Sequence, residues 1–151
     1  MTWWPAGASE SSKTLGMQTS ANGSADGRYA RPLWEGHYDF LFPAVASARV
    51  DALVLEFARK GLDDLRLLKE HAWDRYLGLG VIDVKSPGVE DPDLVAAHIR
   101  RALEVVPPER LMVNPDCGLR HLPAEVARAK LRAMVAGTAQ VRQELGVRPS
   151  I

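Results

Sequence analysis

Apolar residues in the middle of the chain gather in three short runs that start about thirty residues apart. The runs cover residues 50–57, 79–84 and 111–115, and each is rich in Val, Leu, Ile or Met. Apolar runs of this length, bounded by turn residues, are typical of buried β-strands. We therefore predict three strands, the last of which ends abruptly at Asn114.

Around these runs the apolar spacing changes to about 3.6 residues, which predicts amphipathic helices. One begins near Tyr38, with Pro43 in its first turn, and a second covers residues 62–72. A third begins at Asp91, where the aspartate fits a helix cap and the following proline fits the first helical position. Its predicted apolar stripe is Val95, Ile99, Ala102 and Val106. The last helix opens at Pro123, with a predicted stripe of Ala127, Leu131, Met134, Thr138 and Val141.

A strand followed by a helix, repeated about every thirty residues, favours a parallel sheet with right-handed crossovers. A complete (β/α)₈ barrel needs at least ~200 residues, whereas this chain has 151. The sequence therefore predicts an α/β fold, a partial TIM-type barrel that supplies the last three to four βα units. We assign it to residues 29–148. Residues 1–28 lack both periodicities, and we expect a disordered or loosely attached lead-in.

Composition narrows the setting without identifying a partner. Nineteen basic residues balance nineteen acidic ones, so nothing favours nucleic acid or an anionic membrane. No apolar run approaches the ~18 residues of a membrane span, and the start lacks the features of a signal peptide. The only cysteine, Cys117, cannot form an internal disulfide, which favours the cytoplasm.

Two residues at the ends of predicted strands carry candidate chemistry. Cys117 follows the third strand, where a thiol can be a zinc ligand, a nucleophile or a small buried apolar group. Glu56 lies near the end of the first strand, and an acid in an apolar run is costly to bury unless it is paired or metal-bound. The alternative is that Glu56 faces out of a distorted sheet edge.

Three stretches, in this order, closely resemble the carboxyl-terminal catalytic barrel of cobalamin-independent methionine synthase. They are G-V-I-D-V-K-S-P at residues 80–87, P-P-E-R at 107–110 and N-P-D-C-G-L at 114–119, and the resemblance extends over residues 37–146. It implies an S-methyltransferase of methionine biosynthesis. The expected substrates are homocysteine, whose zinc-bound thiolate accepts the methyl group, and methyltetrahydrofolate or another methyl carrier such as a corrinoid-linked one.

The resemblance also implies a metal site. In the family, the cysteine of N-P-D-C-G and a glutamate in a matching V-L-E stretch are zinc ligands, so Cys117 and Glu56 inherit these roles. The family's His-x-Cys pair is missing, and the nearest remnant places Met17 and Thr19 at those two positions. A thioether and a hydroxyl are poor zinc ligands. We therefore expect zinc to bind weakly or not at all.

Lys85 occupies the position of a histidine that is thought to donate a proton to the departing folate in long members of the family. We expect Lys85 and Ser86 on the strand between the two metal-ligand strands, with Lys85 as the catalytic residue. The alternative is a surface lysine, or one paired with Asp83 or Asp116. Ser86, Asn114 and Asp116 are expected to shape the substrate-binding mouth of the site.

The four histidines are not assigned to the metal site. His71 and His98 lie in predicted helices and are expected at the surface, whereas His37 and His121 lie in loops.

Other functions remain open. The chain could be a non-catalytic remnant, or a module that completes its barrel with another chain, because open sheet edges promote self-association. A fragment of a uroporphyrinogen-decarboxylase-like barrel would share the architecture, but the N-P-D-C-G stretch does not particularly favour that family.

Overall fold

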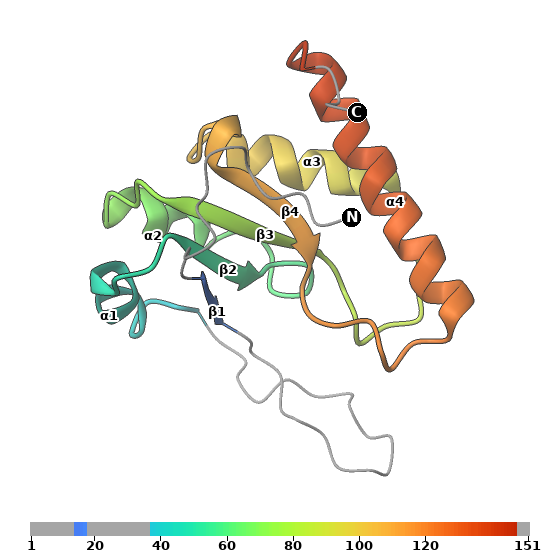
Figure 1. The fold of residues 1–151 in the computed structure, drawn as a ribbon, viewed down its shortest axis with the longest axis horizontal. Helices are drawn as coiled ribbons and strands as arrows, with labels where there is room; N and C mark the ends of the chain where they lie inside the picture. The colour runs from blue at the N-terminus through green and yellow to red at the C-terminus, as the bar shows by residue number, and fades with distance from the viewer. Residues whose placement is uncertain (1–13, 18–36, 148–151) are drawn as a thin grey trace.

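Strands and helices alternate along the chain (Figure 1) in the computed structural model, which describes residues 14–17 and 37–147. The elements are β1 (Thr14–Met17), α1 (Phe42–Ser47), β2 (Ala52–Glu56), α2 (Leu65–Glu70), β3 (Tyr76–Ile82), α3 (Pro92–Leu103), a 3₁₀ turn (Pro108–Arg110), β4 (Leu111–Pro115) and α4 (Ala124–Glu144).

The strands form one sheet in the order β1-β2-β3-β4, and every neighbouring pair is parallel. Helices α3 and α4 pack against β3 and β4. The three strands predicted from the apolar runs are therefore confirmed, in sequential parallel order. The described residues form half of the eight strands that a closed barrel needs, and no closed barrel is formed by them.

Strand β1 corrects part of the predicted lead-in. Residues 14–17 were expected to lack regular structure, yet they pair in parallel with residues 52–55 of β2. The pairing partner, and not the four-residue segment itself, provides the context that makes a strand. The rest of residues 1–28, with residues 29–36 and 148 of the predicted domain, lies outside the described residues.

Strand β3 begins and ends earlier than predicted, at Tyr76 and Ile82. The chain leaves the sheet at Asp83 because its Oδ1 accepts the backbone N–H of Lys85 at 2.8 Å. In addition, Glu90 Oε1 accepts the backbone N–H of Asp83 at 2.9 Å. Lys85 and Ser86 consequently lie in the loop after β3 and not on the strand.

Helix α3 follows its prediction closely. The Asp91 side chain accepts the backbone N–H of Asp93, and Pro92 lies in the first turn. The predicted stripe residues Val95, Ile99, Ala102 and Val106 are all buried. His98, expected at the surface, is half-buried, and burial lowers its pKa.

Helix α4 buries a face that overlaps only in part with the predicted one, since Val141 is buried as predicted and Met134 packs against the core. Leu131 is 37 % exposed, and the buried residues are Lys130, Ala133, Gly137 and Val141. A Cβ at Gly137 would lie 2.5 Å from Pro92 O and 2.7 Å from Val95 Cβ. The absence of a side chain at Gly137 therefore lets α4 approach α3 closely at this point.

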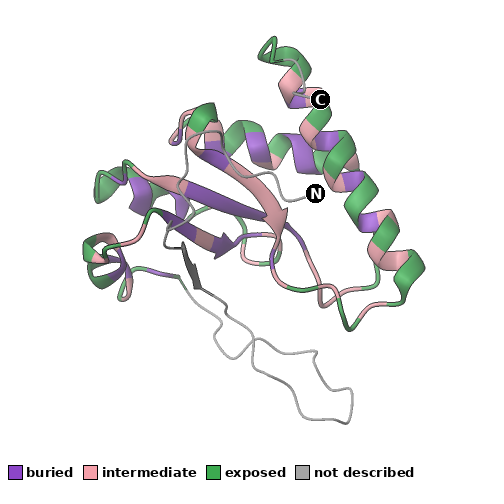
Figure 2. Cartoon of the chain, viewed as in Figure 1, coloured by how far each residue is buried: buried purple, intermediate pink, exposed green. Residues whose placement is uncertain are grey.

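The two faces of the sheet differ in character. Leu53, Leu55, Leu77 and Leu79 are fully buried in the hydrophobic core, and Figure 2 shows β2 and β3 largely in the buried class. Alternate residues point to opposite faces of a strand. The other face carries Val54, Gly78 and Asn114, because a Cβ at Gly78 would lie 2.8 Å from both the Val54 and the Asn114 side chains.

No helix within the described ranges combines the length and apolar character needed to cross a lipid bilayer.

Candidate functional site

Polar side chains from three neighbouring strands lie at one end of the sheet. Glu56 is the last residue of β2, Lys85 lies in the loop after β3, and Asp116 and Cys117 follow β4 directly. Because the strands are parallel, these positions share the carboxyl end of the sheet. Lys85 Nζ lies 3.8 Å from Glu56 Oε2, and both side chains are at most 10 % exposed. Glu56 therefore does not face out of a distorted edge, and Lys85 is not a solvated surface lysine.

Asp116 joins two strands across a third. Its Oδ1 accepts the backbone N–H groups of Phe57 and Ala58, each at 3.2 Å, while its own N–H donates to Ile82 O at 3.0 Å. The carboxylate passes over Gly80, where a Cβ would lie 2.3 Å from Oδ1. Gly80 is therefore required for Asp116 to hold the end of β2 in place.

The Asp116 carboxyl is also the most perturbed acid at this edge. Burial raises its pKa to about 7, and the nearby Glu56 and Asp83 carboxylates add to the rise, whereas the two backbone N–H groups oppose it. A group that titrates near neutral pH and lies among strand ends fits a functional site. The same carboxyl also has a structural role, because it accepts backbone N–H groups at the end of β2.

Tyr38 is a residue of this region that the sequence did not single out. Its side chain is 1 % exposed. Burial raises its pKa, and the Glu56, Asp116 and Asp64 carboxylates contribute to the rise. The signal available in the sequence was an aromatic residue at the point where the apolar pattern begins.

A buried ion pair supports the loop that carries Lys85. Lys130 of α4 is 0 % exposed, and its Nζ lies 2.9 and 3.1 Å from the two carboxylate oxygens of Glu90. Since Glu90 also accepts the backbone N–H of Asp83, α4 is fastened to the end of β3. This contact joins residues forty positions apart, which sequence reasoning missed.

Ser86 and Asn114 make local contacts. Ser86 Oγ accepts the backbone N–H of Gly88 at 3.2 Å, and Asn114 Nδ2 donates to Pro115 O at 2.8 Å. Their expected part in substrate binding, like that of Asp116, stays a prediction.

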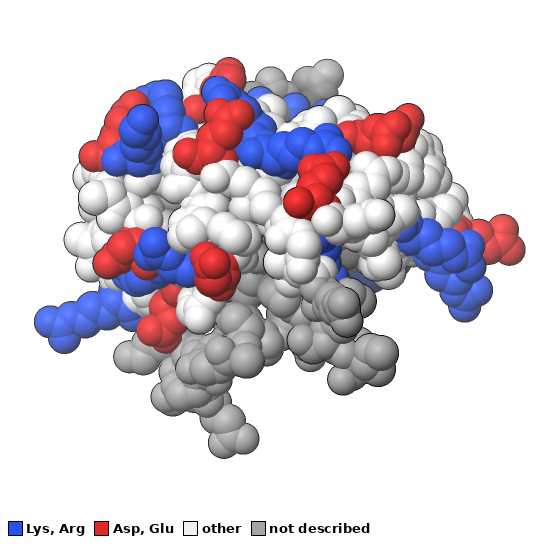
Figure 3. Space-filling model, turned by 90° about the horizontal axis from the view of Figure 1, so that it is seen from above, with Lys and Arg blue, Asp and Glu red and all other residues white. Residues whose placement is uncertain are grey.

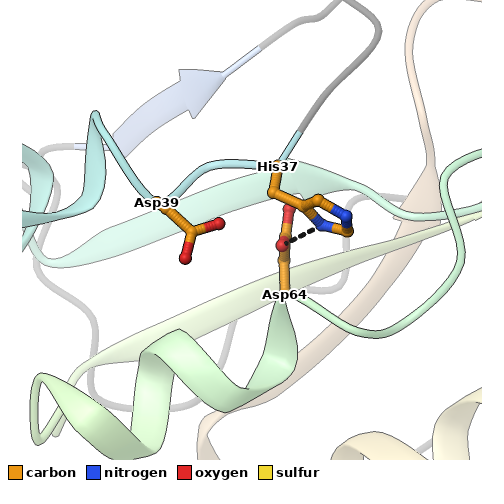
Figure 4. A group of neighbouring side chains, drawn as sticks. All are labelled: His37, Asp39 and Asp64. Atoms are coloured by element: carbon orange, nitrogen blue, oxygen red, sulfur yellow. Dashed lines mark hydrogen bonds and ion pairs between the residues drawn. The ribbon is translucent and has the colours of Figure 1, made fainter.

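The described residues contain one group of three side chains with metal-ligand atoms close together, His37, Asp39 and Asp64 (Figure 4). Protein groups already engage these atoms. Asp64 accepts His37 Nδ1 at 2.7 Å, the backbone N–H of Tyr38 at 2.9 Å and Lys60 Nζ at 3.2 Å. Asp39 pairs with Arg66. The cluster thus fastens the segment before α1 to the start of α2.

The zinc that the resemblance implies does not find a complete site among the described residues. Neither Glu56 nor Cys117 belongs to a group of three candidate ligands there, and catalytic zinc takes three protein ligands or more. Met17 ends β1 and is paired with Leu55, one residue before Glu56, while Thr19 lies outside the described residues. Cys117 is a free thiol of intermediate exposure.

Comparison with known proteins shows the family. Residues 35–140 match the model of the catalytic domain of cobalamin-independent synthase. Methionine synthases from Saccharolobus islandicus and Sulfurisphaera tokodaii are 43 % and 41 % identical to the chain over 110 residues. These alignments cover 73 % of the chain and 33 % and 32 % of the relatives. The chain thus spans about a third of the length of these curated relatives.

A solved structure agrees with this result. A B12-independent methionine synthase from Shewanella sp. W3-18-1, in complex with selenomethionine, superposes with a TM-score of 0.75 at 26 % identity. The match covers 92 % of the chain and 41 % of that protein. Together with the strand-end arrangement of Glu56, Lys85 and Cys117, these matches show that the chain belongs to the cobalamin-independent methionine synthase family, within its catalytic domain.

Proposed function

We propose that the chain carries part of the methyl-transfer site of a cobalamin-independent methionine synthase. The substrates are homocysteine, whose sulfur accepts the methyl group, and a methyltetrahydrofolate or related methyl carrier. The observation that supports this most is the convergence of Glu56, Lys85 and Asp116, from three successive strand ends, in a chain of this family.

Each residue has a role that its position permits. Glu56 and Cys117 are the metal-ligand candidates, one carboxylate and one thiol. Lys85, whose Nζ lies 3.8 Å from Glu56 Oε2, is the candidate proton donor to the departing methyl carrier. Asp116 keeps Glu56 in position through the backbone of the next two residues, and Ser86 and Asn114 border the same edge.

Zinc binding by this set is expected to be weak. Two protein ligands leave half of a tetrahedral shell to water, and water adds none of the pre-organisation that makes protein sites tight.

The test uses the full chain, dialysed against zinc, with metal content and homocysteine methylation measured together. Cys117→Ser and Glu56→Gln should each lower the retained zinc and abolish any measured methyl transfer. The control is Arg128→Gln, at an exposed position in α4. Retained zinc and transfer that are both unchanged by Cys117→Ser would contradict the proposal.

The second candidate function is a module that acts only when its barrel is completed. The open edge of β4 favours it, since β4 pairs with β3 alone among the described residues. A folded chain that retains zinc but transfers no methyl group would favour this candidate.

A further inference from the structure

The four described strands form a sheet whose two edge strands run in the same direction. Within the described residues, β1 pairs only with β2 and β4 pairs only with β3. Unpaired strand edges present rows of N–H and C=O groups that seek a partner strand. Because all four strands run in parallel, the β1 edge of a second sheet can continue the order beyond β4 without a change of direction.

An apolar groove marks the β4 edge. It has a volume of about 760 Å³, and its walls include Val54, Met112, Val113, Met134, Val135 and Val141. These residues belong to β2, β4 and α4, so the groove wraps around both faces of β4. A strand that paired with β4 would place side chains of alternating direction on the two sides of this groove.

Helix α4 forms one wall of the groove. Several of the large apolar side chains that remain exposed lie at or near α4: Leu131, Val135, Leu145 and Val147 are 37 %, 63 %, 46 % and 49 % exposed. Clustered exposed apolar side chains mark an interaction surface. The match to the solved methionine synthase covers 41 % of that protein.

We propose that a second copy of this chain covers the groove, so that two four-stranded sheets close into one eight-stranded barrel. The pairs are β4 with the second copy's β1, and β1 with the second copy's β4, related by a two-fold axis along the barrel. Eight strands are the number at which side chains fill a barrel interior, and closed two-fold assembly is the commonest form of homo-oligomer.

Charge does not oppose this pairing. The formal net charge is zero, so two copies carry no long-range repulsion at neutral pH. Figure 3 shows acidic and basic side chains interspersed on the face that it draws, without a continuous field of one sign.

Closure would change the candidate site. It would place the carboxyl ends of both sheets at one rim and bring a second Glu56 and Cys117 to the same barrel mouth. The inference does not depend on methyl transfer, because solution mass decides it whether or not the chain is active.

The first test is sedimentation velocity of the full chain over a range of concentrations. We expect a mass of twice 16.6 kDa. Val135→Glu puts a charge on an exposed wall of the groove and should weaken the dimer at least about tenfold. Leu94→Glu, at an α3 residue that is 50 % exposed and does not line the groove, should leave the dimer intact. A 16.6 kDa species at all concentrations, or a dimer unaffected by Val135→Glu, would overturn the proposal.

The second test fixes the strand pairing. Leu15→Cys in β1 and Val113→Cys in β4 are each made in a Cys117→Ser background. The two proteins are then mixed and allowed to exchange subunits. A short bifunctional thiol reagent should cross-link the mixture but neither protein alone. Cross-linking of Val113→Cys with itself would show β4 against β4, and it would overturn the head-to-tail arrangement, as would a mixture that fails to cross-link.

Discussion

Strands β3 and β4 are neighbours in one sheet, yet they are buried very differently. Six of the seven residues of β3 are buried, whereas only Leu111 of the five residues of β4 is. The sequence of β4 is apolar over Leu111–Val113, so composition does not cause the difference. Among the strands that the structure describes, β3 has a paired neighbour on each side and β4 has one. The comparison indicates that the part of the site next to β3 is enclosed by packing, whereas the part next to β4 is more exposed.

The largest expected effect concerns the ion pair that fastens the β3 end. Lys130→Met removes the ammonium group and leaves the part-buried Glu90 without its cation. We expect a loss of about 3–5 kcal/mol in the free energy of unfolding, since breaking a buried pair costs more than removing both charges. The measurement is urea unfolding followed by circular dichroism.

Its control is the double variant Lys130→Met, Glu90→Gln. Glutamine still offers an oxygen to the Asp83 N–H, so most of the lost stability should return. A double variant as unstable as Lys130→Met alone would show that packing of the lysine stem, and not charge, is responsible.

The next effect concerns the passage of Asp116 over β3. Gly80→Ala would place a Cβ 2.3 Å from Asp116 Oδ1 and 2.8 Å from Leu55 O, and the backbone carbonyl cannot move cheaply. We expect destabilisation by about 3 kcal/mol, the upper part of the usual range for overpacking. Gly118→Ala is the matched control, because nothing lies within 4 Å of its added Cβ. Equal midpoints in urea for the two variants would contradict this account of Gly80.

A pH effect should follow from Asp116. Its pKa in the folded state is about 7, above its ordinary value of 3.8, so the native state holds a proton there that the unfolded state has lost. Stability should therefore fall as pH rises from about 4 to about 7 and change little above that. We expect this group to change the free energy of unfolding by on the order of 2 kcal/mol over this pH range. This is less than the full pKa shift implies, because the effective dielectric constant at buried sites is higher than that of dry protein.

The Asp116→Asn variant isolates this effect. Asparagine Oδ1 can accept the same two backbone N–H groups but does not titrate. Urea unfolding at a series of pH values, with a metal chelator present, should show a shallower decline for the variant. Identical slopes for the two proteins would rule Asp116 out as the cause.

The smallest effect concerns the cluster before α1. His37→Ala removes one hydrogen bond from a side chain that is 56 % exposed, so we expect a loss below about 1 kcal/mol in unfolding free energy. Zinc retained after dialysis should not change. A drop in retained zinc would move the metal site from the sheet edge to His37, Asp39 and Asp64.

Sequence reasoning located the strands that consist of continuous apolar runs, and the helices with clear caps such as Asp91-Pro92. It missed β1, because four residues carry too little pattern and the pairing with β2 supplies the rest. It placed Lys85 on a strand, because the turn that ends β3 depends on Glu90, which accepts the Asp83 N–H from seven residues away.

At the site, strand-end positions placed Glu56 and Cys117 at the same end of the sheet, but they did not reveal the contacts around them. Asp116 reaches Phe57 across fifty-nine positions, and Lys130 reaches Glu90 across forty. Such contacts leave no periodic signal. The sequence did carry another signal, the two glycines of the G-L-G stretch in β3. Glycine inside a strand often marks a close approach of neighbouring groups.

The central claim is that Glu56 and Cys117 form the protein's part of a metal site at the carboxyl end of the sheet. X-ray absorption spectroscopy of the full chain in excess zinc tests it most directly. We expect one Zn–S distance of about 2.3 Å, with oxygen or nitrogen completing the shell, and we expect the sulfur contribution to vanish in Cys117→Ser. A shell of nitrogen and oxygen alone, unchanged by Cys117→Ser, would contradict the claim.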